Sequence, residues 1–140
     1  MTEISTCLVF NGNCAEAMRF YEKALSGKIE MMMTNAEAPA GQGPPPGNEN
    51  RIMHARLRVD NATFTAMDDM PDAPSTPNHG FWVSLVYDKP ADAKRTYQSL
   101  ETGAKNVVMP LQKTFWAEQF AMVVDRFGTP WMINGGMVPM

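Results

Sequence analysis

The chain has 140 residues, which is the size of one domain and too short for two domains with separate cores. Hydrophobic residues make up 44% and charged residues 19%, a composition that is typical of globular proteins and excludes an intrinsically disordered chain. Twelve Lys and Arg oppose 15 Asp and Glu, so the net charge is −3 and no basic cluster offers a surface for nucleic acid.

The N-terminal residues and the two cysteines suggest a compartment. No apolar run approaches the roughly 18 residues of a membrane-spanning helix, and no signal-peptide pattern opens the chain, so we expect a cytoplasmic protein without a membrane or nucleic-acid partner. Cys7 falls within an expected strand and Cys14 at the start of an expected helix, so both are predicted to be free thiols. We expect Cys14 to pack beneath the helix start; the alternative is a reactive thiol whose pKa the helix N-terminus lowers.

The first 70 residues have the pattern of a strand, a helix and three strands. Alternating apolar residues predict a strand over 4–10, and helical spacing predicts a helix that begins after Asn13 and ends at Gly27. Glu16 follows Asn13 by three residues, as in a capping box. Residues 35–50 contain four Pro and three Gly and predict a long loop. The other expected strands span 28–34, 52–60 and 63–68.

The pattern begins again after a Pro-rich linker. Residues 81–87 are an apolar run typical of a strand, Pro90 suits the first turn of a helix, and Gly103 suits its end. The helix tyrosines Tyr21 and Tyr97 are 76 residues apart, and the glycines that end the two helices have the same separation. The chain therefore carries an internal repeat of one supersecondary unit.

The repeat predicts an α+β fold built from two βαβββ modules, residues 1–70 and 79–137, within a single domain over 1–140. Neither module can bury its sheet face alone, so the two must pair, within one chain or across a dimer. In the second module, Asp125 and Gly128 predict a hairpin turn before the last strand, with Gly128 in the left-handed conformation.

Five segments resemble the PhnB-like branch of the vicinal oxygen chelate superfamily, which also contains glyoxalase I, bleomycin-resistance proteins and extradiol dioxygenases. They are residues 10–17, 20–21, 53–55, 114–117 and 125–134. The resemblance implies concave mixed sheets around a small-molecule cavity and assembly as a homodimer. Some proteins of this branch are labelled methyltransferases of ubiquinone biosynthesis. We do not expect that activity, because the sequence has no strand followed by a glycine-rich loop that could hold S-adenosylmethionine.

The resemblance also implies where a metal ion would lie. Members with a metal hold it with His and Glu side chains from four strands, and the corresponding positions here are Thr6, His54, Trp82 and Met132. Only His54 suits a divalent ion, so we expect no metal cofactor and no chemistry that depends on one. The alternative is a divalent metal ion in a rebuilt site of His54, His79, Asp68 and Asp69.

The candidate ligand-binding residues come from both modules. His54 and Arg56 share one face of a strand, where an imidazole and a guanidinium can meet an anionic group. Trp116 offers an aromatic platform in the second module, and we expect it to line the same cavity as His54. His54 and Glu118 are the candidate catalytic residues, as groups that can transfer protons. The resemblance adds two cavity positions, Trp82 and Met132.

We therefore predict a homodimer that binds a small organic molecule without an obligatory metal. One alternative is an enzyme, a divalent-metal lyase or isomerase of glyoxalase type with a site rebuilt around His54. Another is a resistance protein that sequesters a drug without chemistry. The residue patterns leave the identity of the ligand and any catalysed reaction open.

Overall fold

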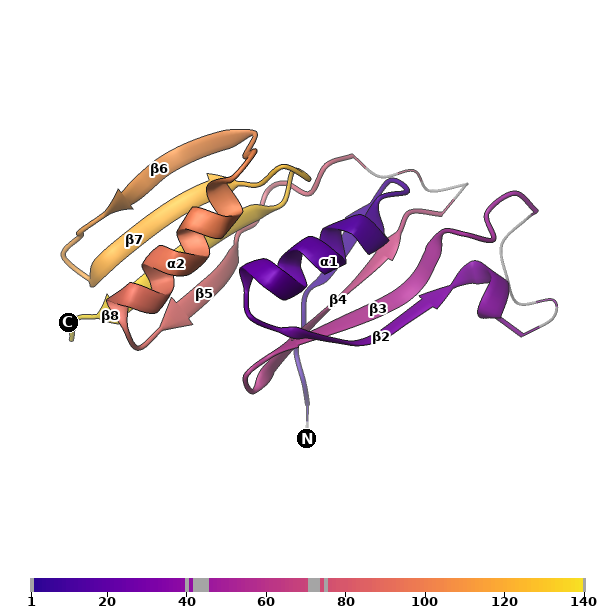
Figure 1. Cartoon of the computed structure of the whole chain (residues 1–140), viewed down its shortest axis with the longest axis horizontal. Helices are drawn as coiled ribbons and strands as arrows, with labels where there is room; N and C mark the ends of the chain where they lie inside the picture. Colours follow the sequence, from indigo (N-terminus) through magenta and orange to yellow (C-terminus); the bar gives the residue numbers. More distant parts are fainter. Residues whose placement is uncertain (1, 40, 42–45, 71–73, 75, 140) are drawn as a thin grey trace. The chain divides into compact units, whose positions relative to one another are not determined.

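The computed structural model describes residues 2–39, 41, 46–70, 74 and 76–139. The chain divides into two compact units, residues 1–77 and 78–140, and each contains one sheet and one α-helix (Figure 1). Within the described ranges, no helix is both long enough and apolar enough to cross a membrane.

The first unit is a mixed four-stranded sheet with one α-helix. Its elements are β1 (Cys7–Phe10), α1 (Cys14–Ala24), β2 (Lys28–Thr34), the 3-10 helix η1 (Asn35–Glu37), β3 (Ile52–Val59) and β4 (Ala62–Asp68). The strand order is β1-β4-β3-β2, with β1 and β4 parallel and the other pairs antiparallel. The first and last strands of the unit are therefore neighbours.

The second unit repeats this topology. Its elements are β5 (Val83–Tyr87), α2 (Pro90–Glu101), β6 (Asn106–Gln112), β7 (Ala117–Val124) and β8 (Pro130–Met137). The strand order is β5-β8-β7-β6, with β5 and β8 parallel and the other pairs antiparallel. The predicted α+β fold with a duplicated βαβββ pattern is confirmed.

Some predicted boundaries are wrong by a few residues. The first strand begins at Cys7 instead of residue 4, and β5 begins at Val83 instead of residue 81. β3 ends before Asp60, because Asp60 has a positive φ of 52° and lies in the turn to β4. The predicted loop 35–50 starts with η1, since Asn35 bonds to the far end of the loop through its main-chain N–H and its side chain. Residues 40 and 42–45 of this loop lie outside the described ranges.

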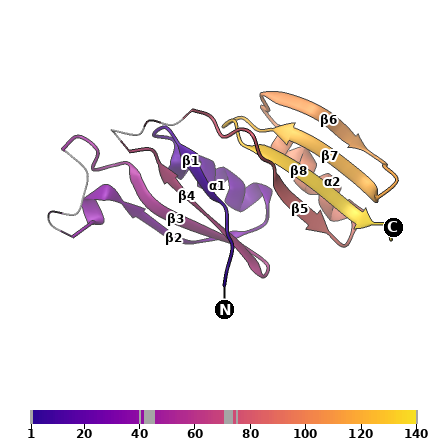
Figure 2. The ribbon, with the colours of Figure 1, turned by 180° about the vertical axis from the view of Figure 1, so that it is seen from behind.

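In each unit the helix covers one face of its own sheet, and in the reverse view the strands lie in front of the helices (Figures 1 and 2). Leu8, Tyr21 and Leu57 are fully buried in the first unit, and Leu100 and Trp131 are fully buried in the second. Burial of these large side chains is the main stabilising contribution to each unit. In the described part of each unit, no helix of that unit covers the other side of the sheet, which we call the uncovered face.

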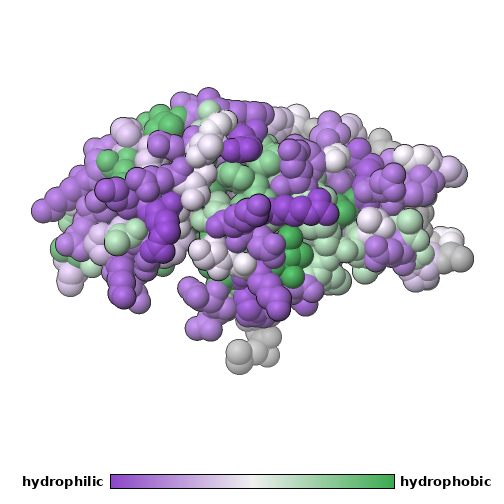
Figure 3. Space-filling view, viewed as in Figure 1, coloured by the Kyte–Doolittle hydropathy of each residue, from purple (hydrophilic) through white to green (hydrophobic). Residues whose placement is uncertain are grey.

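Seen from the helix side, hydrophilic side chains cover much of the surface, and hydrophobic ones show over the edge strand β6 among other places (Figure 3). Val107 and Val108 of β6 are exposed. Pro110 lies in the same strand and has no N–H to offer to a further strand, a common protection of sheet edges.

The start of α1 is held by a residue that the sequence did not indicate. The side chain of Asn13 makes no capping hydrogen bond, so the predicted capping box with Glu16 is wrong. Instead, the main-chain N–H of Cys14 donates to Oδ1 of Asp68 at 3.0 Å. Because Asp68 lies 54 residues further along, at the end of β4, this cap depends on the tertiary fold.

The end of α1 needs a glycine for space. Gly27 follows the helix as predicted, but Ser26 is the residue with the left-handed φ of 53°. A Cβ at Gly27 would lie 2.7 Å from the carbonyl oxygen of Arg58 and 2.8 Å from Cδ2 of Leu57. The glycine therefore allows the chain to pass close to β3.

The turn between β7 and β8 is organised by a buried carboxylate. Oδ1 of Asp125 accepts the main-chain N–H groups of Phe127 and Thr129 at 2.8 and 3.0 Å. Its Oδ2 accepts Nε1–H of the buried Trp131 at 2.8 Å. Gly128 has a φ of 88°, so the predicted hairpin turn with a left-handed glycine is confirmed.

Candidate functional site

His54 and Arg56 lie on the uncovered face of the first sheet. Their neighbour Ala55 and the next residue but one, Leu57, are fully buried on the side of α1. Successive side chains of a strand point to opposite faces, so His54, Arg56 and Arg58 share the other side. His54 is half-buried and the two arginines are exposed.

The arginines of this face are held by one carboxylate. Nε of Arg56 lies 3.2 Å from Oε1 of Glu30, and Nε of Arg58 lies 2.8 Å from Oε2. The hydrogen bond from Arg58, with the charges of both guanidiniums, lowers the pKa of Glu30. The hydrogen bond to Glu30, with the charges of Glu30 and Glu3, raises the pKa of Arg58, so the two guanidiniums face two carboxylates.

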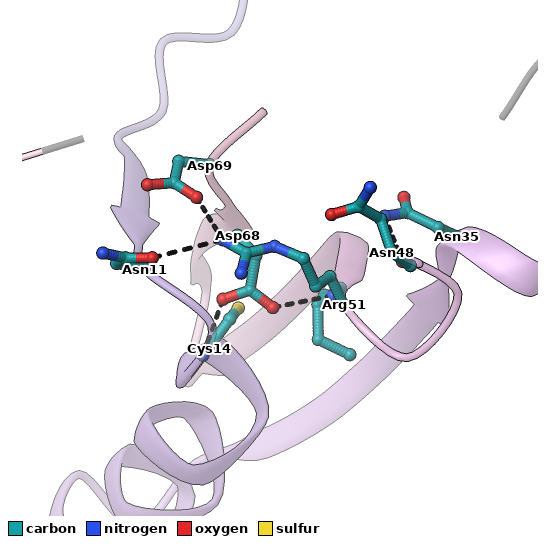
Figure 4. Close-up of polar contacts among 8 residues, drawn as sticks. Asn11, Cys14, Asn35, Asn48, Arg51, Asp68 and Asp69 are labelled. Atoms are coloured by element: carbon teal, nitrogen blue, oxygen red, sulfur yellow. Dashed lines mark hydrogen bonds and ion pairs between the residues drawn. The ribbon is translucent and has the colours of Figure 1, made fainter. Parts of the chain in front are cut away.

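A polar cluster joins the end of β4 to the starts of α1 and β3 (Figure 4). Asp68 is buried, and its Oδ2 accepts the main-chain N–H of Ile52 at 2.7 Å while Oδ1 caps α1. Arg51 forms an ion pair with the neighbouring Asp69 and bonds to Oδ1 of Asn11 at 3.5 Å. The cluster ties three connections of the first unit together.

These contacts bear on the possible rebuilt metal site. Both carboxylate oxygens of Asp68 accept main-chain N–H groups, and Asp69 is paired with a guanidinium. In the described ranges, no three or more His, Cys, Asp or Glu side chains are grouped so that they could hold a metal ion. The donor set around Asp68 and Asp69 therefore fits a divalent ion poorly.

Trp116 lies in the short turn before β7, and local hydrogen bonds fix this turn. Thr114 accepts the main-chain N–H of Ala117 with its hydroxyl at 3.2 Å and donates its own N–H to the carbonyl of Ala117 at 3.0 Å. The N–H of Val138 donates to the carbonyl of Trp116 at 2.8 Å. The backbone that carries the indole is thus held from both sides.

The side chain of Trp116 belongs to an aromatic and amide group that we call the Trp116 cluster: Trp116, Phe115, Phe120 and Asn134. Nε1–H of the indole donates to Oδ1 of Asn134 at 3.1 Å. The ring centroid of Trp116 lies 4.9 Å from that of Phe115 and 5.1 Å from that of Phe120, both in edge-on arrangements. Asn134 and Phe120 are buried, whereas the side chain of Phe115 is 78% exposed.

The Trp116 cluster lies on the uncovered face of the second sheet. Trp131 and Ile133 of β8 are fully buried on the side of α2, so alternation places Met132 and Asn134 on the opposite face. Asn134 pairs with Phe120 in the register of β7 and β8, and Met132 pairs with Met122. Met132, a predicted ligand-binding residue, therefore shares a face with Trp116's partner Asn134.

The remaining predicted site residues lie elsewhere in the second unit. Trp82 is half-buried and directly precedes β5, and His79 is exposed. Glu118 is exposed on β7, and its Oε2 would clash with a Cβ at Gly136. Since the same Cβ would lie 2.8 Å from Cγ of Pro90, this carboxylate is close to the first turn of α2. A shared cavity of His54 and Trp116 stays a prediction, because they belong to different units.

Asn134, Phe115 and Phe120 were not among the predicted site residues. Asn134 is two positions after Met132, so strand alternation already placed both on one face. The ring contact with Phe120 depends on the β7–β8 register, which no pattern in the sequence indicated.

Cys14 is buried and Cys7 is exposed, and both are free thiols as predicted. Burial raises the pKa of Cys14 to about 12, with further contributions from the Asp68 carboxylate and Cys7. The alternative of a reactive Cys14 is therefore wrong, because desolvation and a neighbouring carboxylate outweigh the helix N-terminus.

Comparison with known proteins places the chain among relatives of similar length. A family model described as 3-demethylubiquinone-9 3-methyltransferase matches residues 2–134. The protein YjdN of Escherichia coli (strain K12) is 31% identical over 139 residues, which cover 94% of this chain and 93% of the relative. The uncharacterized protein Mb0911c of Mycobacterium bovis is 25% identical over 127 residues, which cover 87% of this chain and 76% of the relative.

Solved structures agree with these matches. Protein PA1353 from Pseudomonas aeruginosa has a TM-score of 0.88 and 39% identity, with 96% of this chain and 98% of that chain covered. The PhnB protein from Bacillus cereus has a TM-score of 0.73 at 21% identity, with 96% and 99% covered. A glyoxylase/bleomycin resistance protein/dioxygenase domain from Frankia sp. EAN1pec has a TM-score of 0.67 at 11% identity, with 97% and 93% covered. At these low identities, the last two likenesses show a shared fold.

Proposed function

The chain belongs to the 3-demethylubiquinone-9 3-methyltransferase family, whose PhnB-like members the sequence resembles, and from this premise we propose that it binds a small organic molecule at the Trp116 cluster. The glyoxalase/bleomycin-resistance-like fold predicted from the resemblance is confirmed.

The observation that carries the proposal is the hydrogen bond between Nε1 of Trp116 and Oδ1 of Asn134. This bond uses the only polar atom of the indole, so the ring is held in one orientation before a ligand arrives. Preorganised aromatic side chains bind with a small loss of conformational entropy. Phe115, exposed at the edge of the indole, adds apolar surface that a ligand can cover.

The chemistry of the Trp116 cluster favours a flat and largely apolar molecule. Its four side chains are three aromatic rings and one amide, and Met132 and Met122 lie on the same face of the sheet. Aromatic rings stack on flat ligands, while thioethers adapt to their outline. Arg56 and His54 of the first unit and Trp82 of the second remain proposed ligand-binding residues.

We propose ligand binding without a divalent metal and without methyl transfer. Of the four positions where superfamily members hold a metal, His54 alone carries an imidazole or a carboxylate, while Thr6, Trp82 and Met132 do not. In neither unit is the strand before the helix followed by a glycine-rich loop: residues 11–13 link β1 to α1, and Asp88 and Lys89 link β5 to α2. The family's descriptive name therefore does not carry over to this chain as an activity. A homodimer and a cytoplasmic location belong to the same proposal.

The proposal can be tested with 8-anilinonaphthalene-1-sulfonate, a flat aromatic fluorescent probe. We expect Trp116→Ala to weaken binding of the probe by about 1–3 kcal/mol, the range for losing the contacts of one large side chain. Val108→Ala is the control, because Val108 is exposed on β6 outside the Trp116 cluster. Equal affinity of wild type and Trp116→Ala for the probe would remove the site from the Trp116 cluster.

Native mass spectrometry of freshly purified protein addresses the other parts of the proposal. We expect the mass of a dimer, and any bound molecule that copurifies should be organic. Elemental analysis should find well under one Zn, Ni, Mn or Fe per chain. A stoichiometric divalent ion that is lost in His54→Ala together with thermal stability would instead support a metal-dependent lyase or isomerase, since a metal bound to the native state stabilises it.

A further inference from the structure

One imidazole on the first sheet stands between two methionines. Met33 of β2 is the direct register partner of His54 of β3. On the other side of β3, Ala55 pairs with Ala66, so the next step along the same antiparallel register brings Met67 of β4 beside His54. Three neighbouring strands therefore place the side chains of Met33, His54 and Met67 at one level of the sheet.

These three side chains point to the same face. Ala55 and Ala66 are fully buried beneath α1, which contacts both β3 and β4. Strand alternation therefore directs His54 and Met67 to the uncovered face. Met33 shares this face, because the side chains of directly paired residues lie on one side of a sheet. All three residues are half-buried, so each keeps part of its surface accessible.

The spacing of paired strands allows all three donors to reach one ion. Neighbouring strands lie about 4.8 Å apart, and directly paired residues have Cβ atoms about 5 Å apart. Met has three side-chain torsions and can turn its sulfur toward the imidazole of the residue next to it. The carboxylate on this face, Glu30, is already held by Arg56 and Arg58.

Two thioethers and one imidazole form a soft donor set. Thioether and thiolate ligands select Cu(I), whereas Mg, Ca and Mn prefer oxygen donors and structural Zn sites use thiolates and imidazoles. We propose that Met33, His54 and Met67 form a binding site for Cu(I). This site uses no residue of the Trp116 cluster, and His54 is the one proposed ligand-binding residue that it shares. The site is compatible with the expected lack of a divalent metal.

The test is a titration with Cu(I) in competition with the chromophoric chelator bicinchoninate, under anaerobic reducing conditions. All proteins carry Cys7→Ser, because Cys7 is an exposed thiol on β1 that would bind Cu(I) by itself. We expect one Cu(I) per chain in this background. Met33→Leu, Met67→Leu and His54→Gln should each weaken binding at least tenfold, since each removes one of three ligands.

Met32→Leu is the matched control. Met32 precedes Met33 on β2 but pairs with the buried Ala55, so its side chain lies on the helix side of the sheet. We expect this variant to bind Cu(I) like the background protein. Circular dichroism and urea unfolding of every variant separate a lost ligand from a lost fold, and leucine matches the size of methionine.

The proposal is wrong if the Cys7→Ser protein takes up no Cu(I) in the presence of bicinchoninate. It is also wrong if Met32→Leu weakens binding as much as Met33→Leu and Met67→Leu, because the sulfur atoms would then contribute without regard to the face they occupy. Neither result would affect the Trp116 cluster, which the organic probe tests in the second unit.

Discussion

The two units share one topology but hold the start of their helices differently. At the end of the parallel strand pair, Asp68 stands opposite Phe10 in the first unit, and Gly135 stands opposite Tyr87 in the second. The buried Asp68 accepts the first N–H of α1, whereas α2 begins with Pro90, which has no N–H to satisfy. The same position of the repeated fold therefore holds a hydrogen-bonding carboxylate in the first unit and a glycine in apolar contact in the second.

The uncovered faces of the two sheets differ more than their cores. The first sheet presents His54 with methionines and an ion-paired group of charged side chains, and the second presents the Trp116 cluster. The helix-covered faces both bury a helix tyrosine, Tyr21 or Tyr97, together with strand side chains. The two helix-covered faces are therefore alike in what they bury, and the two uncovered faces present different chemistry.

The largest effect on stability is expected in the turn between β7 and β8, and the matching turn between β3 and β4 should show almost none. Asp125→Ala removes the acceptor of three N–H groups, two of which belong to the buried residues Thr129 and Trp131. We expect this substitution to destabilise the protein by about 4 kcal/mol. The matching turn contains the exposed Asp60 with a positive φ, and Asp60→Asn should change stability by less than about 0.5 kcal/mol, since Asn tolerates that φ. Urea unfolding measures both, and similar losses would contradict the account of the turns.

The second largest loss of stability is expected when the Asp68 cap of α1 is removed. Asp68→Ala leaves the N–H groups of Cys14 and Ile52 without their acceptor, at an expected loss of about 3 kcal/mol. Asn13→Ala should cost less than about 0.5 kcal/mol, because its side chain makes no cap. The reverse order in urea unfolding would mean that the local cap, and not the tertiary one, holds α1.

The apolar contact of the second unit can be tested with a smaller change. A Cβ at Gly135 would clash with Cβ of Ala93 and lie 3.1 Å from Cα of Pro90, so Gly135→Ala should destabilise by about 1–3 kcal/mol through overpacking. Adding Ala93→Gly should recover part of this loss beyond its own helix cost, which a double-mutant cycle measures. Strict additivity of the two substitutions would contradict the close contact.

Replacing a cysteine should have the smallest effect on stability at neutral pH. Because the folded pKa of Cys14 is about 12 and an unfolded thiol has a pKa of about 8.5, the unfolded state loses its proton first as pH rises. The contribution of the Cys14 thiol to the free energy of unfolding is therefore complete below about pH 8.5 and is lost as the pH rises toward 12. Cys14→Ala should remove this part of the pH dependence of stability, which urea unfolding at several pH values measures. At pH 8, iodoacetamide should modify Cys7 and spare Cys14 in the native protein; modification of both at one rate would contradict the burial of Cys14.

The sequence predicted the elements that depend on local pattern. Apolar periodicity and terminal glycines located both helices, and Asp125 with Gly128 located a turn that is closed by its own backbone. Asn13 was wrongly predicted as the helix cap because its competitor, Asp68, lies 54 residues away. Local rules cannot rank a distant carboxylate against a near amide.

The candidate site shows the same limit. Trp116 was recognised from its residue type and neighbours, and Met132 from the resemblance, but Asn134 as the indole's partner and Phe120 as its ring contact required the register of β7 and β8. Likewise, the pairing of Glu30 with Arg56 follows from a strand pairing that the sequence left undefined.

The most direct test of the proposed ligand site uses the indole N–H resonances of uniformly 15N-labelled protein. The chain has three tryptophans, of which Trp116 bonds to Asn134 and Trp131 to the buried Asp125. Trp116→Phe assigns one indole resonance and Trp131→Phe another. On titration with 8-anilinonaphthalene-1-sulfonate, the resonance of Trp116 should shift in a saturable way while that of Trp131 stays in place. A saturable shift of Trp131 with an unmoved Trp116 would contradict the assignment of ligand binding to the Trp116 cluster.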